Sequence, residues 1–461
     1  MSPYTWLASR VLFPLHEVLK GHDSVRVRRE LEESQWWSPE ALRALQLQRL
    51  KALLRHARER VPYYRERLAD VPFERWEDVS ELATLPFLTK ALISDHMEAL
   101  KAENARGLAR FNTGGSTGKP LIFFIGKERV SHDVAAKWRA TRWWDVDIGD
   151  REIVVWGSPV ELGAQDRVRE LRDSLLRTRL IPAFEMSPAN LEAFVRQIRA
   201  FRPRMLFGYP SSLSRIARHA EEGGQRMDDL GIAVAFVTSE RLYDDQRATI
   251  ERVFGCPVAN GYGGRDAGFI AHQCPEGGMH ITAEDIIVEI VGEDGRPLPP
   301  GEAGEVVVTH LATRDFPFIR YRTGDVAVLD SGRCACGRGL PMLREIQGRT
   351  TDFIVARDGT VMHGLALIYV LRDIEGIEQF KIVQESLDRT RVQIVRGDGF
   401  DATIEPSIRH AFRQRLGEGV EVRLEYVDEI PAERSGKFRY VVSRVADARN
   451  GGRSGEAGRR A

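Results

Sequence analysis

Between about residue 110 and residue 345, short apolar runs alternate with stretches of helical periodicity. The apolar runs lie at residues 153–156, 205–207 and 234–237, and the helical stretches at residues 190–201 and 244–254. Alternation of this kind is typical of βαβ units, in which neighbouring strands pair in parallel. The sequence therefore predicts an α/β fold whose large N-terminal domain is built on mainly parallel sheets.

Residues 281–330 follow a different pattern. Strand-like runs at 286–290, 305–309 and 326–329 are separated by turns rich in glycine and proline, such as GEDGRPLPPGEAG. Short strands joined by such turns are typical of antiparallel pairing. We expect a small antiparallel or barrel-like β unit attached to the large domain.

The chain of 461 residues is too long for one core, because single cores stop growing at roughly 250–300 residues. We expect an N-terminal domain over residues 1–347, with a helical segment at 1–70, and a small α+β lid domain over 348–445. One helix should begin at Ser38-Pro39, with Ser38 as its N-cap. Residues 446–461 are rich in glycine and arginine, which favours a disordered tail.

The first 20 residues contain an apolar face at helical spacing. It is formed by Tyr4, Leu7, Val11, Leu15 and Val18. Proline in a helix removes a hydrogen bond, so Pro14 should kink or interrupt this helix. We expect the helix to pack on its own domain rather than on a membrane. The absence of a targeting signal and of a transmembrane stretch favours a cytoplasmic protein.

Charge and cysteine content exclude two classes of protein. The 67 basic and 67 acidic residues leave no net field that would attract nucleic acid. Four cysteines in a chain of this length do not make a disulfide framework. Cys256, within the segment FGCP, is expected to pack in the core.

Residues 111–120, FNTGGSTGKP, combine glycines with three hydroxyls and one lysine. Glycine lets backbone amides approach an anion closely, and hydroxyl and ammonium groups donate to phosphate oxygens. A P-loop is excluded, because only three residues separate Gly114 from Gly118 and Pro120 stands where that motif has Ser or Thr. We predict phosphate contacts from Thr113, Gly114, Gly115, Ser116, Thr117, Gly118 and Lys119.

Four later segments carry further aromatic, acidic and basic groups. They are YGGRD at 262–266, YRTGD at 321–325, GRTTD at 348–352 and PAERSGK at 431–437. Together with TGGSTGKP, and in this order, they resemble the signature motifs of adenylate-forming enzymes. LPFLTK at 85–90 and VPYYR at 61–65 also resemble the phenylacetate–coenzyme A ligase branch and its capsule-cluster relatives. The resemblance spans about residues 50–440 and implies an AMP-forming ligase.

The resemblance implies a nucleotide site made of separate segments. The loop at 113–119 would hold the β- and γ-phosphates of ATP. Tyr262, beside Gly263, would stack on adenine, and Glu240 would line the same pocket. Asp325 would bind the ribose hydroxyls.

It also implies the catalytic residues Lys437, Asp266 and Arg349. Lys437 would reach both the substrate carboxylate and the α-phosphate, where two anions meet and a fixed cation stabilises the developing charge. Asp266 would help to place Mg²⁺, although the family usually has Glu there. Arg349 lies near the expected hinge, where Thr351 and Asp352 depart from the usual spacing.

Cysteine and histidine residues at 272–280 and 334–336 predict a metal site. Three thiolates and one imidazole satisfy tetrahedral Zn²⁺ and leave no open position, which indicates a structural role. The resemblance favours Cys274, His280, Cys334 and Cys336 as ligands, because relatives carry the histidine in a Gly-x-His segment. From the sequence, His272 is an alternative to His280.

The acid and the acceptor are the least constrained part of the prediction. Trp156, Gly157, Tyr209 and Pro210 lie at the ends of strand runs and are candidates for an aryl or hydrophobic carboxylate. Coenzyme A is the acceptor that the resemblance implies. A carrier-protein thiol, an amine or a glycan stays open, as does a nucleotide-binding regulator without chemistry. The resemblance is compatible with a homodimer.

Overall fold

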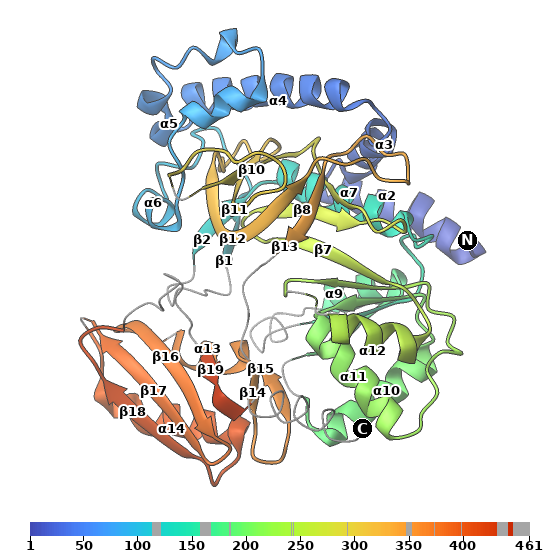
Figure 1. Cartoon of the computed structure of the whole chain (residues 1–461), viewed down its shortest axis with the longest axis vertical. Coiled ribbons are helices and arrows are strands. Elements are labelled where there is room, and N and C mark those ends of the chain that lie inside the picture. Colours follow the sequence, from blue (N-terminus) through green and yellow to red (C-terminus); the bar gives the residue numbers. More distant parts are fainter. Residues whose placement is uncertain are drawn as a thin grey trace, which may run out of the picture.

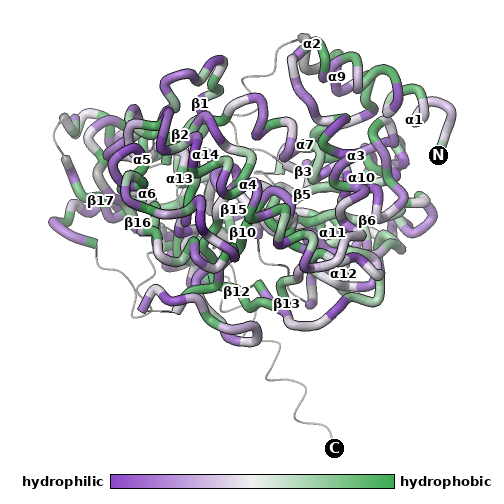
Figure 2. Tube along the Cα trace, turned by 90° about the horizontal axis from the view of Figure 1, so that it is seen from above, coloured by the Kyte–Doolittle hydropathy of each residue, from purple (hydrophilic) through white to green (hydrophobic). Residues whose placement is uncertain are grey.

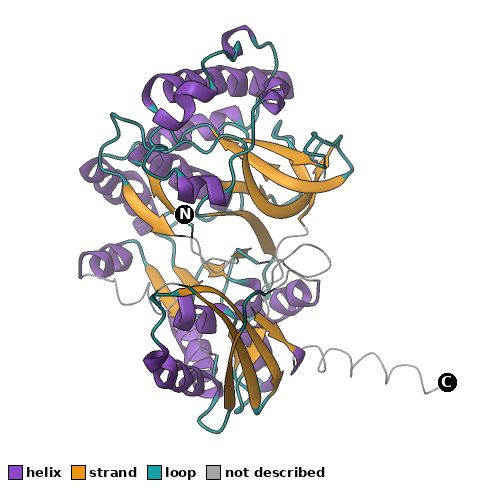
Figure 3. Cartoon of the chain, turned by 90° about the vertical axis from the view of Figure 1, so that its left-hand side faces the viewer, coloured by secondary structure: helices purple, strands orange, loops and turns teal. Residues whose placement is uncertain are grey.

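The computed structural model (Figure 1) describes residues 1–461 except 113–120, 157–166, 184–185, 241, 243, 293, 347–352, 373, 398, 431–440 and 446–461. The described chain contains an 11-stranded sheet, a four-stranded sheet and two two-stranded sheets. Helices from the first part of the chain lie at one end of the molecule, and the C-terminal sheet lies at the other (Figures 1 and 3).

The N-terminal segment is mostly helical. Its elements are α1 (Pro3–Leu7), the π-helical turn η1 (Ala8–Leu12), α2 (Phe13–Lys20), α3 (Ser24–Ser34), α4 (Pro39–Arg60), α5 (Pro62–Arg67), the short 3₁₀ turns η2 (Phe73–Arg75) and η3 (Val79–Thr84), and α6 (Lys90–Asp95). The predicted start of α4 is confirmed, because the Ala41 amide donates to the Ser38 hydroxyl and Pro39 holds the first helical position. Pro14 does not break the chain into separate helices; the π-helical turn directly precedes α2, where Pro14 holds an early position.

One half of the 11-stranded sheet is parallel. Its strands are β3 (Glu152–Trp156), β4 (Thr178–Pro182), β5 (Met205–Gly208), β6 (Val234–Thr238) and β7 (Val258–Gly264), and the associated helices are α7 (Lys127–Arg142), α9 (Arg167–Leu175), α10 (Pro188–Phe201), α11 (Pro210–Glu222) and α12 (Asp244–Phe254). Successive residues of β5 face opposite cores: Leu206 packs with α10–α12, whereas Phe207 packs with α7. Burial of both faces explains why these strands are continuous apolar runs.

The other half of this sheet is antiparallel. It contains β8 (Gly268–Gln273), β9 (Met279–Ile281), β10 (Ile286–Val291), β11 (Ala303–His310), β12 (Tyr321–Asp330) and β13 (Met342–Ile346), while β1 (Ala109–Asn112) and β2 (Ile122–Ile125) form a separate pair. The α/β class is confirmed, but the sheet is mixed rather than mainly parallel. The predicted antiparallel strands are present. A closed barrel is not found among the described pairings, because β13 pairs with β9 and so joins these strands to the main sheet.

Residues beyond 352 form their own core. The elements are β14 (Phe353–Val355), β15 (Val361–His363), α13 (Leu365–Arg372), β16 (Ile377–Ser386), β17 (Arg389–Arg396), the 3₁₀ turn η4 (Ala402–Ile404), α14 (Glu405–Leu416), β18 (Glu421–Tyr426) and β19 (Val441–Ser443). The boundary at 347/348 and the tail at 446–461 lie outside the described residues and stay predictions. Within the described chain, no helix combines the length and apolar content needed to cross a membrane.

Candidate active site and metal centre

The carboxyl ends of β3, β5 and β6 lie in register with one another and with Asn260 inside β7. Val155 of β3 pairs with Gly208 of β5, Gly208 pairs with Val237 of β6, and Val237 pairs with Asn260 of β7. The residues that follow each of these positions therefore meet along one edge of the sheet. Ligands of open α/β sheets bind outside this edge, which makes it a candidate binding site.

Two predicted substrate residues stack on each other at this edge. The rings of Trp156 and Tyr209 lie 4.4 Å apart between centroids and are inclined by 21°. Gly208 lets the strands approach, because a Cβ there would lie 2.5 Å from the Val155 carbonyl oxygen. Pro210 starts α11 directly after Tyr209. Gly157 lies outside the described residues.

The chain leaves β6 through a strained backbone. Ser239 has φ +72°, in the left-handed region that residues other than glycine rarely adopt. Glu240, the predicted nucleotide residue, follows at once. Strain of this kind is concentrated at functional sites, where it fixes the direction of the chain.

Side chains from β7 and β12 meet although these strands are not neighbours in the sheet. The Tyr262 hydroxyl donates to the Asp325 carboxylate over 3.1 Å. The Tyr321 hydroxyl donates to the Asp266 carboxylate over 2.6 Å. The structure thus makes two tyrosine–carboxylate contacts between segments that lie 63 and 55 residues apart in the sequence.

A buried arginine supports the segment that carries Asp266. The Arg129 guanidinium donates to the carbonyl oxygens of Arg265 and Asp266 over 3.2 and 3.1 Å, and to the Asp133 carboxylate over 3.2 Å. Burial alone would raise the pKa of Asp133, but Arg129 and His310 hold it below its usual value. Arg129 is absent from our sequence prediction, because it lies on α7, 136 residues before Arg265, in no recognisable motif. We regard it as a positioning residue.

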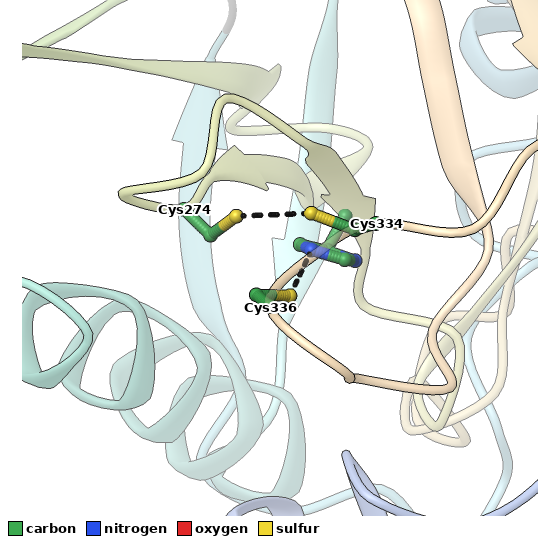
Figure 4. A group of neighbouring side chains, drawn as sticks. Cys274, Cys334 and Cys336 are labelled. Atoms are coloured by element: carbon green, nitrogen blue, oxygen red, sulfur yellow. Dashed lines mark hydrogen bonds between the residues drawn. The ribbon is translucent and has the colours of Figure 1, made fainter.

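The four predicted metal ligands come together, as Figure 4 shows for the three cysteines. Their ligating atoms all lie within 4.8 Å of one another, with 3.5 Å between the sulfurs of Cys274 and Cys334 and 3.2 Å between the Cys336 sulfur and His280 Nε2. Zn²⁺ with sulfur ligands at ~2.3 Å places neighbouring sulfurs roughly 3.8 Å apart in a tetrahedron. The four side chains fit that ion. Among the described residues this is the one cluster of three or more potential metal-ligating side chains.

The surroundings favour the metal-binding form of two of the four ligands, His280 and Cys336, whereas burial and the contact with Cys334 raise the pKa of the Cys274 thiol to about 12. Burial lowers the pKa of His280 to about 4, which keeps the imidazole neutral. Burial alone would raise the pKa of the Cys336 thiol, but hydrogen bonds from Arg338 lower it. His272 is instead buried between the rings of Phe236 and Phe269, so the structure selects His280.

Two protein families and several known proteins match this chain. Residues 111–312 match the AMP-binding enzyme family, and residues 354–444 match the CapK C-terminal domain. The chain is 28% identical over 438 residues to the phenylacetate–coenzyme A ligase of Thermus thermophilus, covering 87% of this chain and 96% of the relative. It is 25% identical over 378 residues to Protein CapK of Staphylococcus aureus, covering 80% and 81%. These matches support the adenylate-forming enzymes as the superfamily of this chain.

A solved structure of 2-hydroxyisobutyryl-CoA ligase in the thioesterification state shares the fold of this adenylate-forming enzyme. The TM-score is 0.62 at 21% identity, covering 92% of this chain and 95% of that one. The postadenylation state gives a TM-score of 0.56 at 20% identity, covering 89% and 91%. The family resemblance inferred from the motifs and the class of AMP-forming ligase are confirmed.

Several predicted residues of this adenylate-forming enzyme lie outside the described residues. They are the phosphate loop 113–119, Arg349 and Lys437. Their roles stay predictions. Cys256 is buried in the core beside the parallel sheet, as predicted, and burial raises its pKa to about 12.

Proposed function

We propose that this enzyme activates a carboxylic acid with ATP and passes the acyl group to the thiol of coenzyme A. In the first step a carboxylate oxygen attacks the α-phosphorus of ATP, and pyrophosphate leaves. In the second step the thiol sulfur, having lost its proton, attacks the acyl carbonyl carbon, and AMP leaves. The second step yields a thioester, and neither step changes an oxidation state.

The observation that carries the proposal is the contact between Tyr262 and Asp325 beside the edge where the parallel strands end. An aromatic ring offers a face on which adenine can stack. A carboxylate can accept hydrogen bonds from two vicinal hydroxyls, as ribose presents. Glu240 follows β6, the strand that pairs with the strand of Tyr262. These groups support an adenosine site at this edge.

Charge at the reacting atoms would be balanced by the cations that the sequence predicts. Mg²⁺ is held in proteins by one or two carboxylates together with substrate phosphates, so Asp266 can serve as its protein ligand. Asp is one methylene shorter than Glu, so the position of Asp266 matters for metal binding. Tyr321 fixes its side chain, and Arg129 fixes its backbone. Mg²⁺ would supply charge neutralisation on the phosphates. Lys437 and Arg349 complete the proposed catalytic set.

An aryl or hydrophobic acid is the proposed substrate class. The stacked rings of Trp156 and Tyr209 offer a flat apolar surface next to the proposed adenosine site. The strands β3 and β5 that precede these rings pair in register with β6, which precedes Glu240, and β6 pairs with β7, which carries Tyr262, so the acyl group and the nucleotide would lie side by side.

The test of the whole reaction is a product screen. Purified enzyme is incubated with ATP, Mg²⁺ and a panel of aryl, aliphatic and hydroxy acids, with and without coenzyme A, and the products are separated by mass spectrometry. We expect AMP, pyrophosphate and an acyl-coenzyme A for at least one aryl or hydrophobic acid. ATP binding without pyrophosphate release for any acid would contradict the proposed activity.

A second acceptor class is favoured by one observation. Residues 354–444 match the CapK C-terminal domain, whereas the AMP-binding match ends at residue 312. The family match that supports the nucleotide site therefore does not extend to the C-terminal part. This acyltransferase function would be favoured by two results together: the enzyme forms an acyl-adenylate that coenzyme A does not consume, and an amine, a glycan or a carrier-protein thiol does consume it.

Replacing Asp325 with alanine should raise the KM for ATP by about 10- to 100-fold, because hydrogen bonds to a charged group contribute about 1.5–3 kcal/mol. Tyr262→Phe keeps the ring and removes only the hydroxyl that donates to Asp325, so the expected change is less than about tenfold. Initial rates of ATP–pyrophosphate exchange measure both. Asp330→Ala, on the same strand, is the matched control and should leave KM unchanged. Equal effects of Asp325→Ala and Asp330→Ala would contradict the ribose assignment.

Replacing Trp156 with alanine should lower kcat/KM for the preferred aryl acid by about 10- to 100-fold, because the loss of a ring contact costs about 1–3 kcal/mol. The KM for ATP should stay within about twofold, because the proposed nucleotide contacts lie on other strands. Exchange rates across the acid panel separate the two parameters. A parallel loss for every acid, together with a raised KM for ATP, would show a general structural defect instead of a substrate contact.

A structural Zn²⁺ is also proposed for Cys274, His280, Cys334 and Cys336. The metal would join the loop after β8 to the loop before β13. The loop before β13 also carries Arg338 and Gly339, which both bond to Gln35. The Arg338 Nε donates to the Gln35 side chain over 3.0 Å, and the Gly339 amide donates to the Gln35 carbonyl over 2.9 Å. The ion would therefore also hold the junction between α3 and α4 in place.

A further inference from the structure

The N-terminal helical segment turns its apolar face to solvent. Leu15 is 57% exposed, Val18 71% and Leu19 79%. We define the outer face as the exposed apolar side chains of this segment: Trp6, Leu7, Val11, Leu15, Val18 and Leu19. The sequence predicts that the helix packs on its own domain; it does so, but through the opposite face, and Leu7, Val11, Leu15 and Val18 of the predicted apolar face are exposed. Single exposed apolar side chains are common, but a group of them on one face of a protein marks an interaction site.

The opposite face of the same segment already anchors it to the protein. Thr5 and Ala8 are fully buried, and the Thr5 hydroxyl donates to the Asp150 carboxylate over 2.7 Å. Phe13 packs edge-to-face on Trp138 with 5.1 Å between centroids. Because the inner face makes these contacts, the outer face is available without rearrangement of the fold.

The apolar surface continues onto α9. The Tyr4 hydroxyl donates to the Leu175 carbonyl over 2.7 Å, which places the end of α9 beside α1. Leu171 and Leu175 are both exposed large apolar side chains. Figure 2 shows α1, α2 and α9 at one end of the molecule near the N-terminus, with hydrophobic stretches on α2 and α9. The surface is thus broader than one helix.

The exposed charged side chains of residues 1–20 have one sign: they are Arg10 and Lys20. The carboxylate of this stretch, Glu17, is 3% exposed and accepts hydrogen bonds from Ser24, His16 and His22. Asp23, three residues beyond Lys20, is exposed and pairs with Arg26. Apolar side chains that include tryptophan, bordered by cations and with no exposed carboxylate among them, are typical of helices that lie in the plane of an anionic membrane surface.

We propose that the outer face docks this enzyme on the surface of a bilayer that contains anionic lipids, with the helical segment lying in the headgroup region. The six apolar side chains enter the boundary of the acyl chains, and Arg10 and Lys20 contact lipid phosphates. This binding does not depend on the proposed reaction. A second copy of the chain is the competing occupant. It is less favoured because lipid phosphates offer the cations a complementary charge that a second copy of the outer face, with no exposed carboxylate, does not.

The test is flotation of the full chain with vesicles of phosphatidylcholine, with or without one quarter phosphatidylglycerol. We expect binding to the anionic vesicles that weakens as salt is raised, because the surface potential is screened. Leu15→Glu/Val18→Glu should lower the partition coefficient by about 100-fold, because it removes two apolar side chains that would enter the bilayer. Arg10→Gln/Lys20→Gln should lower binding to anionic vesicles by about fivefold per cation.

The matched control is Ala44→Glu/Gln48→Glu, which adds the same two carboxylates to exposed positions of α4. It should leave vesicle binding unchanged, and circular dichroism should show that both double variants fold. Failure of the unchanged protein to float with anionic vesicles overturns the proposal. So does flotation that Leu15→Glu/Val18→Glu leaves unaltered. A concentration-dependent dimer that this variant abolishes, without lipid binding, would instead identify the face as a self-association surface.

Discussion

Replacing Lys437 with alanine is expected to lower carboxylate-dependent ATP–pyrophosphate exchange by about 100- to 1,000-fold. Attack of a carboxylate on a phosphate brings two anions together, and a preorganised cation at the developing charge contributes about 3–4 kcal/mol. The KM for ATP should change little, because a cation that acts in the transition state mainly changes kcat. Exchange measured at saturating acid and ATP gives the maximal rate of the adenylation step without a contribution from binding.

Lys381→Ala is the matched control for this variant. Lys381 lies on β16 of the C-terminal sheet, pairs across the strand with Gln393 and belongs to none of the adenylate-forming motifs. Its replacement removes one cation from the same part of the chain and should leave exchange within about twofold of the unchanged enzyme. If Lys437→Ala retains full exchange, the proposed role of Lys437 is wrong even if the enzyme forms adenylates.

The second large effect concerns the metal. Protein purified without chelators should contain about one Zn²⁺ per chain, and Cys274→Ser or Cys336→Ser should reduce the bound metal at least tenfold, because each replaces a thiolate ligand. Both variants should also melt at a lower temperature, since the loop that holds Gln35 through Arg338 loses its anchor. Elemental analysis and thermal unfolding measure the two consequences.

Cys256→Ala separates loss of metal from loss of packing. Cys256 is buried in the core beside the parallel sheet, away from the cluster of four ligands, so its replacement should lower stability without changing the zinc content. Absence of zinc from the unchanged protein would contradict the metal assignment. Equal zinc content in Cys256→Ala and Cys274→Ser would contradict it as well.

The sequence predicts most secondary-structure elements, because their signals are local. The apolar runs of β5 and β6, the capped start of α4 at Ser38 and the helix at 244–254 are each encoded by neighbouring residues. Pairing between strands is not local. The runs at 286–290 and 326–329 indicate strands, but only the pairing of Met342 with His280 shows that they extend the main sheet instead of closing a barrel.

The residues of the site also divide into those that local sequence signals predict and those that they do not. Tyr262, Asp325 and Asp266 could be chosen from motifs, because each motif has a characteristic order of residue types. Arg129 could not be chosen in this way, because it donates to backbone carbonyl groups far along the chain. Every residue has such a carbonyl, so the residue types do not show which one accepts the hydrogen bond. The outer face shows a third limit. Periodicity locates the apolar face of a helix, whereas the small and polar residues Thr5 and Ala8 decide which face the protein covers.

The central claim, activation of a carboxylate as its adenylate, is tested most directly by oxygen transfer. An acid that supports exchange is labelled with ¹⁸O in its carboxylate and turned over with ATP and coenzyme A, and the phosphate-containing products are analysed by mass spectrometry. We predict one ¹⁸O atom in AMP and none in pyrophosphate, because the carboxylate oxygen that attacks the α-phosphorus leaves with AMP. Label in inorganic phosphate, formed together with ADP, would mean an acyl phosphate intermediate and would contradict the account.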